Sequence, residues 1–242
     1  MAGEAAELLK TDEYSEYLGL EHGALEALKT SKERGIRSCL VFTSPHHRFR
    51  KKWEKISEEE GFVVSQLEKE LNRRAIERDK RRDEEMEWAD YIRTNSTLVG
   101  QSLVAGGADP KKVIDIPLGA DISDLRPFMP RKKGEPMRFV VSGRVSQRKG
   151  AAFLLQAWQK MRPKGASLHF YGSVMLNKRE LPGEDTGVFF HGNVSPEEVQ
   201  KAYREAHVLV FPTLCDGFGM VVPEAMAAGC AVITTKNAGP VS

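Results

Sequence analysis

The sequence predicts an α/β protein built of two doubly wound, Rossmann-like domains. Short apolar runs typical of buried parallel strands alternate with segments of helical periodicity, most regularly in the second half of the chain. The 242 residues, 40% hydrophobic and 29% charged, provide material for one large or two small domains. Residues 126–136, rich in Pro, Gly and Lys, form the best linker in the chain. We therefore place a domain boundary near residue 130, between residues 1–130 and residues 131–242.

Composition and charge exclude several classes of protein. The net charge of +2, from 36 basic and 34 acidic residues, argues against a nucleic-acid-binding protein that relies on bulk electrostatics. Cys39, Cys215 and Cys230 lie far apart in or beside apolar runs, which is typical of reduced, buried cysteines rather than of disulfides or a metal site. The sequence shows neither a signal peptide nor an apolar run of the roughly 18 residues that span a bilayer. We expect a soluble, cytoplasmic protein, and peripheral membrane contact remains compatible with this composition.

The first half of the chain has the less regular pattern. Residues 1–12 indicate no element, and the apolar positions within 15–34 fit one face of a helix that Gly35 ends. Opposite charges at helical spacing, such as Glu77 and Arg81, predict a long helix with a mostly solvated face, and the interleaved acidic residues disfavour a basic nucleic-acid-binding arm. The further expected elements are a strand at 38–43, the charged helix at 66–88, a strand at 89–96, a helix that Asn95 or Ser96 caps and that runs toward the glycines at 106 and 107, and a strand at 113–116.

Two adjacent histidines follow the strand predicted at 38–43. His46 and His47 belong to the loop at the carboxyl end of that strand. Ligands of open α/β sheets bind at this end of the strands. The two histidines are therefore candidate site residues, and solvated loop histidines are the alternative interpretation.

The second half alternates strand and helix with short loops, which predicts a parallel sheet. The expected strands are 138–142, 167–171, 188–191, 207–211 and 231–235, and the expected helices are 151–161, 196–206 and the segment that follows the glycine turn at 217–219.

That glycine turn is the most informative stretch of the chain. It follows the apolar run at 208–211 and leads into a helix rich in small residues. A buried strand, a tight glycine turn and a helix N-terminus together favour an anion, because glycine lets the backbone approach a ligand and the free N–H groups point at negative charge. Asp216 and Glu224, eight positions apart across the turn, could both face one small polar ligand. These features predict a site for a nucleotide sugar.

A second motif lies at the same predicted edge of the sheet. Gly143-Arg144 ends the strand at 138–142, and Lys149-Gly150 opens the next helix. Arginine binds phosphate through two parallel hydrogen bonds and lysine adds a mobile point charge, so both could neutralise a diphosphate. Two exposed surface cations are the alternative. Neither a Gly-x-Gly-x-x-Gly after a strand nor a P-loop motif is present in the sequence.

The order of these motifs resembles the retaining, GT-B-fold glycosyltransferases of family four, also called group 1 glycosyltransferases. The resemblance is specific over residues 138–242 and looser over residues 15–130. Its motifs are Gly143-Arg144, Lys149-Gly150, Phe190-His191-Gly192-Asn193-Val194, Phe211-Pro212-Thr213, Asp216-Gly217-Phe218-Gly219 and Glu224-Ala225-Met226-Ala227-Ala228-Gly229. Compared with the family pattern, the chain enters the first domain midway and stops in a loop of the second. We therefore expect both GT-B domains to be incomplete and the chain to be a fragment of such an enzyme.

The resemblance implies a role for each matching residue. Arg144 and Lys149 would bind the donor diphosphate and stabilise the leaving group, and Glu224 would accept hydrogen bonds from the ribose hydroxyls. Asp216 stands where the family usually has glutamate and would contact hydroxyls of the donor sugar. His46 is the nearest match, and His47 the next, to a first-domain histidine close to the anomeric carbon. The remaining donor-binding residues would be Gly143, His191, Asn193, Val194, Gly217, Phe218, Gly219 and Met220. A strand-end histidine without a ligand is an equal interpretation of His191.

The activity implied is transfer of a hexose-like sugar from a UDP- or GDP-sugar to a hydroxyl acceptor with retention, in polysaccharide, cell-envelope or glycoside synthesis. The nucleotide sugar is the donor substrate, and the resemblance implies neither a separate cofactor nor a metal. Two alternatives are another GT-B activity, such as a sugar-nucleotide epimerase or a phosphorylase, and a non-catalytic fragment that only binds nucleotide sugar.

Overall fold

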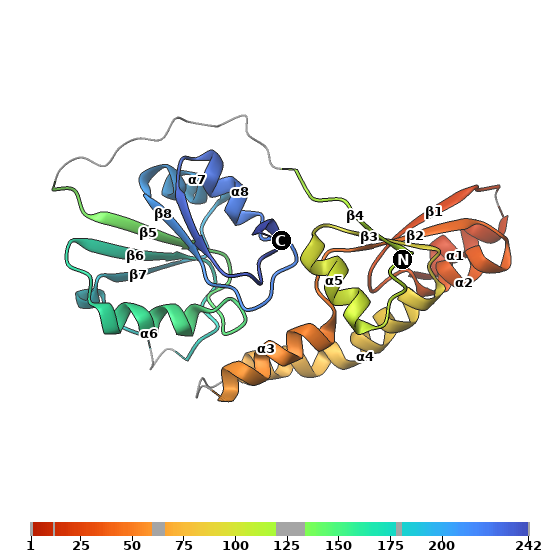
Figure 1. The fold of residues 1–242 in the computed structure, drawn as a ribbon, viewed down its shortest axis with the longest axis horizontal. Helices are drawn as coiled ribbons and strands as arrows, with labels where there is room; N and C mark the ends of the chain where they lie inside the picture. The colour runs from red at the N-terminus through yellow and green to blue at the C-terminus, as the bar shows by residue number, and fades with distance from the viewer. Residues whose placement is uncertain (1, 12, 60–65, 120–133, 178–180, 242) are drawn as a thin grey trace.

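The chain forms two units, each built on a parallel sheet (Figure 1). The computed structural model describes residues 2–11, 13–59, 66–119, 134–177 and 181–241. The first sheet has the strand order β1-β2-β3-β4 and the second β7-β6-β5-β8-β9. The boundary predicted near residue 130 lies outside the described residues, and the two sheets lie on either side of it. The predicted α/β class with parallel sheets is confirmed.

The first unit surrounds a core to which β2, β3 and two helices contribute buried apolar side chains. Leu40, Phe42 and Ile92 from these strands pack with Leu28 and Leu103 from two helices, and all five are fully buried. The strands of this unit are β1 (Glu16–Leu20), β2 (Arg37–Phe42), β3 (Tyr91–Thr94) and β4 (Val113–Asp115). Its helices are α1 (Ala2–Thr11), α2 (Leu25–Glu33), α3 (His47–Glu59), α4 (Gln66–Trp88) and α5 (Thr97–Gly106).

The helix predicted over residues 15–34 is wrong in its first half. Residues 16–20 form β1, which pairs in parallel with β2, and only α2 is helical. Leu18 fitted the helical pattern, but it is 66% exposed on this edge strand. Tyr17 packs against the core in its place. Helix α1 and helix α3, in which His47 is the first residue, had no counterpart in the prediction.

The long charged helix is confirmed as α4, but some of its charged side chains are buried rather than solvated. Asp79, Arg82 and Glu85 are buried. The Arg82 guanidinium lies 2.7 Å from the carboxylate of Glu21, and both side chains are 7% exposed. Arg81 was predicted to pair with Glu77, but it forms ion pairs with Glu26 and Glu85 instead. A buried charge is tolerated only when it is paired and hydrogen-bonded, so these contacts fix α4 against the turn that follows β1.

The second unit matches its prediction to within one residue at every boundary the prediction gave. Its strands are β5 (Met137–Ser142), β6 (Ala166–Tyr171), β7 (Val188–Gly192), β8 (Val208–Phe211) and β9 (Ala231–Thr234). Its helices are α6 (Ala151–Met161), α7 (Pro196–Glu205) and α8 (Val221–Ala227), with short 3-10 turns η2 (Glu184–Thr186) and η3 (Gly239–Val241).

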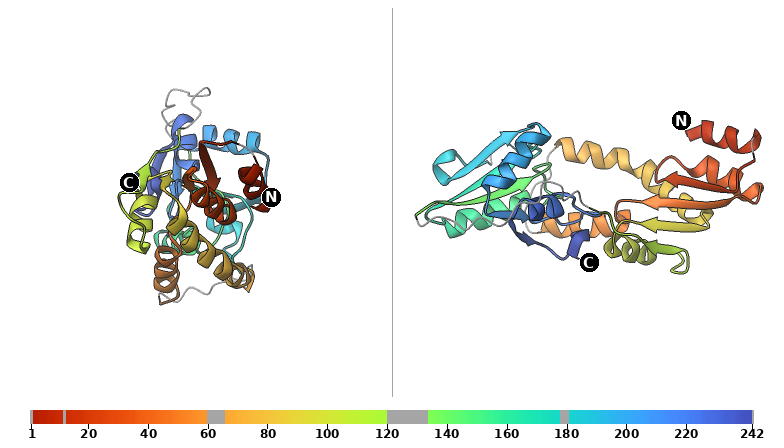
Figure 2. Two further views of the ribbon diagram at one scale, coloured as in Figure 1. Left: turned by 90° about the vertical axis from the view of Figure 1, so that its right-hand side faces the viewer. Right: turned by 90° about the horizontal axis from the view of Figure 1, so that it is seen from above.

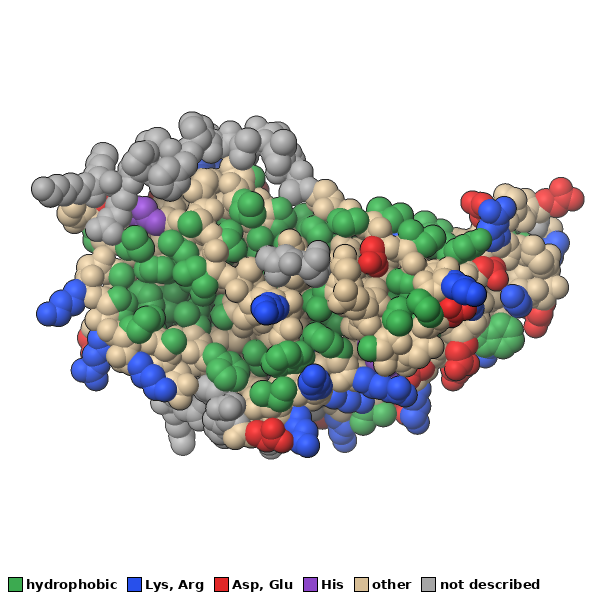
Figure 3. Space-filling view, in the orientation of Figure 1, with side chains coloured by type: hydrophobic (Ala, Val, Ile, Leu, Met, Phe, Trp, Pro, Cys, Tyr) green, Lys and Arg blue, Asp and Glu red, His purple; other side chains and the backbone are tan. Residues whose placement is uncertain are grey.

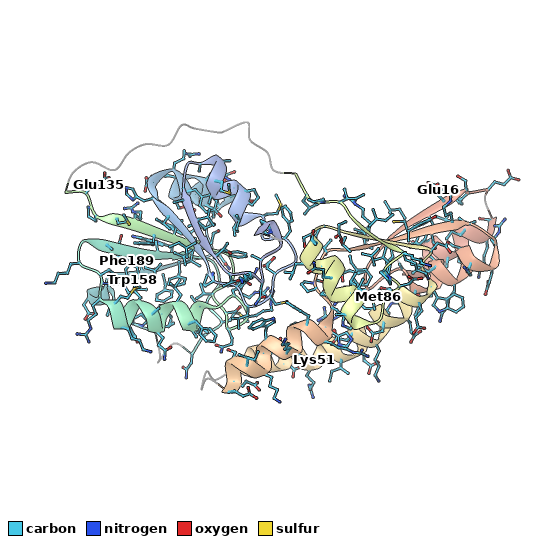
Figure 4. All side chains as sticks on the ribbon, viewed as in Figure 1. Glu16, Lys51, Met86, Glu135, Trp158 and Phe189 are labelled. Atoms are coloured by element: carbon cyan, nitrogen blue, oxygen red, sulfur yellow. The ribbon has the colours of Figure 1, made fainter. Side chains whose placement is uncertain are left out.

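Helices cover both faces of the second sheet. Trp158 of α6 lies on one face (Figure 4). Its ring packs edge-on against Phe139 of β5, with ring centroids 5.5 Å apart. Helices α7 and α8 contribute Tyr203 and Ala225 to the core on the other face. The chain runs from β5 to β6 and β7 on one side and returns to β8 and β9 on the other, so the strand order reverses between β5 and β8. Open α/β sheets bind ligands at the carboxyl end of such a switch point.

The two units lie end to end (Figure 2). On the face shown in Figure 3, charged side chains gather mostly over the first unit and along its lower edge, whereas apolar side chains occupy much of the second. Within the described residues, no helix combines the length and the apolar character needed to cross a membrane.

Candidate functional site

The two loops predicted to carry the site meet at the switch point between β5 and β8. The ammonium group of Lys149 forms an ion pair with the Asp216 carboxylate and lies 5.2 Å from the ring centroid of Phe211. Arg148 ties the loops together, since its guanidinium donates to the carbonyl oxygen of Cys215 over 2.9 Å. The structure therefore brings together one predicted residue from each motif.

Burial sets the electrostatics of Lys149. Removal from water lowers the pKa of its ammonium group below the ordinary value, and the neighbouring Asp216 carboxylate opposes that shift. The charge of Lys149 is thus held in a partly buried position by one acidic partner.

Two glycines allow the close approach of these loops. Gly150 has a φ of +73°, and a Cβ atom there would lie 1.8 Å from the carbonyl oxygen of Pro212. Gly219 has a φ of +76°, and its Cβ would lie 2.6 Å from the ring of Phe211. Both positions require glycine for backbone conformation and for space.

Glu224 lies in the first turn of α8, where its side chain meets a buried tyrosine. The Tyr203 hydroxyl lies 3.4 Å from Oε2 of Glu224 and donates to it. Sequence reasoning did not single out Tyr203, because one tyrosine on the apolar face of an amphipathic helix has the signature of a core residue. Its spacing from Glu224 gives no sequence signal of a contact.

Three other predicted donor-site residues of the second unit lie at or just after the ends of β5 and β7. Arg144 is exposed on the loop after β5. His191 is the next-to-last residue of β7 and stacks on Tyr171 with ring centroids 4.3 Å apart. Its Nε2 lies 3.0 Å from Nδ1 of His169. Asn193 is exposed on the turn that follows. The described contacts of His191 are thus with its own sheet, and its role in the site stays a prediction.

Residues of the first unit reach the turn at Gly217. The Ser96 hydroxyl, which caps α5, donates to the carbonyl oxygen of Gly217 over 2.5 Å. The carbonyl oxygen of Thr43 lies so close that a Cβ atom on Gly217 would be 1.9 Å from it. Thr43 follows β2, Ser96 follows β3 and Gly217 follows β8, so the carboxyl ends of the two sheets face each other. A cavity of about 540 Å³ opens beside this contact, lined in part by Thr97, Phe218 and Met226.

His46 and His47 point toward α4. Nε2 of His46 lies 3.1 Å from the Asp83 carboxylate, and Nε2 of His47 lies 3.0 Å from it. His46 is 2% exposed, and its ring packs so tightly that a Cβ on Gly106 would lie 2.3 Å from it. The structure does not bring either histidine together with Lys149 and Asp216.

Among the residues that the structure describes, His46, His47 and Asp83 form a group whose ligand atoms lie close enough together to hold a metal ion. The backbone N–H of Arg48 donates to Nδ1 of His46 over 3.1 Å, so the hydrogen of the neutral ring lies on Nε2 and points at Asp83. A metal at Nε2 would place that hydrogen on Nδ1, against the Arg48 N–H. These hydrogen bonds therefore favour His46 as a hydrogen-bond donor to Asp83 rather than as a metal ligand.

Burial of His46 predicts a pH-dependent stability. Burial, the neighbouring His47 and the cations of Arg82 and Arg48 hold the pKa of His46 at about 4, below its ordinary 6.5, although Asp83 opposes the shift. We expect the free energy of unfolding to fall as the pH drops from 6.5 toward 4, because the unfolded chain binds a proton there that the folded chain does not. His46→Gln should make this fall shallower in urea unfolding followed by tryptophan fluorescence. An equally steep fall in the variant would assign the pH dependence to other groups.

Comparison with known proteins relates this geometry to one family. Residues 136–242 match the family model described as glycosyl transferases group 1. The chain is 28% identical over 165 residues to sulfoquinovosyl transferase SQD2 of Arabidopsis thaliana, covering 62% of this chain and 31% of the relative. It is 27% identical over 176 residues to D-inositol 3-phosphate glycosyltransferase of Corynebacterium jeikeium, covering 62% and 42% respectively. The chain thus spans less than half the length of these two relatives.

Solved structures show the same arrangement of two sheets. The Anabaena protein HepE in complex with UDP and glucose superposes with a TM-score of 0.58 at 17% identity, over 97% of this chain and 63% of that one. The lipopolysaccharide outer core galactosyltransferase WaaB superposes with a TM-score of 0.65 at 18% identity, over 98% and 61%. These likenesses confirm the predicted GT-B fold.

Proposed function

We propose that this protein transfers a sugar from a nucleotide-diphosphate sugar to a hydroxyl acceptor with retention of configuration, because residues 136–242 match the group 1 glycosyltransferase family model and the chain has a GT-B fold. The observation that carries the proposal is the meeting of Lys149 and Asp216 at the switch point of the second sheet. A cation and a carboxylate held side by side match the two halves of such a donor, a charged diphosphate and a polyhydroxylated sugar. The UDP and glucose bound to HepE support a donor of this class.

The ion pair between Lys149 and Asp216 gives the donor site a defined starting state. An arriving diphosphate offers the ammonium group more negative charge than one carboxylate does, so Lys149 exchanges Asp216 for phosphate. Asp216 then turns its free oxygens to the sugar hydroxyls. The ion pair is thus replaced by two contacts to the same donor.

The transfer step follows from charge stabilisation. As the bond between sugar and diphosphate breaks, negative charge grows on the leaving phosphate, and the fixed cations of Lys149 and Arg144 stabilise it. The acceptor hydroxyl attacks the face that the diphosphate leaves and passes its proton to the leaving phosphate, which retains the configuration. Glu224 meanwhile accepts hydrogen bonds from the ribose.

The test uses the 242-residue chain with radiolabelled UDP- and GDP-sugars and a panel of hydroxyl acceptors. Release of nucleotide together with labelled glycoside supports transfer, and analysis of the product's anomeric centre tests retention. Binding without turnover would favour the alternative of a non-catalytic protein that only binds nucleotide sugar. A chain that binds neither nucleotide sugar contradicts the proposal.

Replacing Glu224 by alanine tests where the donor binds. Its expected effect is weaker binding of both UDP and the intact donor in calorimetry, because the ribose is common to both. Unchanged affinity in this variant would show that the ribose lies elsewhere.

A further inference from the structure

We infer that Tyr203 is a positioning residue of the donor site. Its hydroxyl holds the Glu224 carboxylate in the orientation in which that carboxylate accepts hydrogen bonds from the ribose hydroxyls. The inference rests on the proposed function, because it assumes that Glu224 faces the nucleotide. It adds a residue that lies on a different helix and that does not itself touch the donor.

The geometry fixes a single partner for the tyrosine hydrogen. The side chain of Tyr203 extends from α7, is fully buried and places its oxygen 3.4 Å from Oε2 of Glu224 on α8. A buried hydroxyl costs free energy unless it is hydrogen-bonded, so a purely apolar role would be filled better by phenylalanine. The hydroxyl therefore has a function in this position beyond filling space.

The backbone around the contact is held from both sides. Cys230, which follows α8, lies with its Sγ 3.1 Å from the carbonyl oxygen of Tyr203. Tyr203 also shares its core cluster with Val222 and Ala225 of α8. Because α7 and α8 are fixed against each other, the position of the hydroxyl relative to Glu224 is set by the fold rather than by the ligand.

A second hydroxyl orients the first. Burial, the largest influence, and the Glu224 carboxylate raise the pKa of Tyr203 well above its ordinary value, whereas a hydrogen bond from Ser142 to the tyrosine oxygen lowers this pKa. Tyr203 therefore stays protonated, accepts from Ser142 and donates to Glu224. Ser142 is the last residue of β5, directly before Gly143 and Arg144. The hydrogen bonds from Ser142 to Tyr203 and from Tyr203 to Glu224 thus form a relay. This relay connects the end of β5, two residues before Arg144, to the Glu224 carboxylate.

The consequence is selectivity for ribose. One carboxylate oxygen is engaged by Tyr203, so Glu224 keeps a fixed rotamer and offers its remaining lone pairs toward the ribose hydroxyls. Without the tyrosine hydroxyl the carboxylate rotates freely, and part of the contact to the ribose is lost. A nucleotide that lacks both ribose hydroxyls has no such contact to lose.

The experiment compares two pairs of nucleotides in the unmodified chain and in one variant. Calorimetry measures the affinity of the full chain for UDP and for 2′,3′-dideoxy-UDP, with GDP and 2′,3′-dideoxy-GDP as the second pair. In Tyr203→Phe the preference for the ribonucleotide should fall by about fivefold to thirtyfold, the range expected for a hydrogen bond to a charged group. In transfer assays the KM for the donor should rise while kcat stays within about twofold, because the ribose contact is the same in the ground and transition states.

Three further single variants and one double variant separate a positioning role of Tyr203 from a structural one. Tyr17→Phe removes a half-buried tyrosine hydroxyl from the first unit and should leave the ribose preference unchanged. Glu224→Gln should reduce the preference itself, and adding Tyr203→Phe to it should have no further effect, since the two residues act through one contact. Ser142→Ala should shift the preference in the same direction as Tyr203→Phe, but less.

The outcomes distinguish this inference from the proposed function. Equal weakening of UDP and dideoxy-UDP in Tyr203→Phe would indicate a structural role and overturn the inference, as would an unchanged preference. If the unmodified chain prefers ribonucleotides and Glu224→Gln loses that preference while Tyr203→Phe keeps it, only the relay fails. If the unmodified chain binds none of the four nucleotides, the proposed function fails and the inference with it.

Discussion

Replacing Lys149 by alanine is expected to lower the rate of sugar transfer by about a hundredfold or more, the scale of losing one preorganised charge that stabilises a leaving group. The ammonium group is held in the loop by Asp216 and by the face of Phe211, so its position is set before the donor arrives. The variant also leaves the Asp216 carboxylate partly buried without its cation, which further opposes an incoming diphosphate. Steady-state transfer assays at saturating donor would measure the loss as a fall in kcat.

A matched control lies on the helix that Lys149 introduces. Lys160, in the last turn of α6, is exposed, so Lys160→Ala removes the same side chain without touching the site. We expect its transfer rate to equal that of the unmodified chain. A loss of less than tenfold in Lys149→Ala, or a fall confined to KM, would contradict the role of this lysine in stabilising the leaving group.

Periodicity alone was sufficient for the second unit. Its strands are short and mostly apolar and are separated by helices, one of which, α7, carries a local start signal in Ser195, which forms a capping box with Glu198. Each element is specified by its own residues, and parallel strands joined by helices leave few arrangements. The rule that loops at the carboxyl ends of such strands converge also placed Lys149 and Asp216 in one site.

The first unit shows where such reasoning fails. β1 is an edge strand whose exposed Leu18 happens to stand at helical spacing from Leu25 and Leu28 of α2. The buried pair of Glu21 and Arg82 joins residues far apart in the chain, and a local pattern cannot distinguish it from a solvated ion pair. Contacts of this kind depend on the tertiary fold, and the same is true of Tyr203 with Glu224 in the second unit.

Replacing Gly217 by alanine is the second change expected to have a large effect. The added Cβ would lie 1.9 Å from the carbonyl oxygen of Thr43 and 3.2 Å from Cα of Ser44. Both are backbone atoms of the first unit, so no flexible side chain can move aside. Either the units separate or the turn that carries Asp216 shifts, and the hydrogen bond from Ser96 to the Gly217 carbonyl is strained in both cases.

The expected result is a loss of transfer with the affinity for UDP nearly intact. Lys149 and Glu224 belong wholly to the second unit, so UDP should bind within about threefold of its normal affinity, whereas a misplacement of about 1 Å between the units can lower transfer up to a hundredfold. Gly23→Ala is the control, because nothing lies within 4 Å of the added Cβ there. Calorimetry with UDP and transfer kinetics on the same samples separate the two effects. Unaltered transfer in Gly217→Ala would mean that the contact between Gly217 and Thr43 is absent during turnover, because no working arrangement can contain both that contact and the added methyl group.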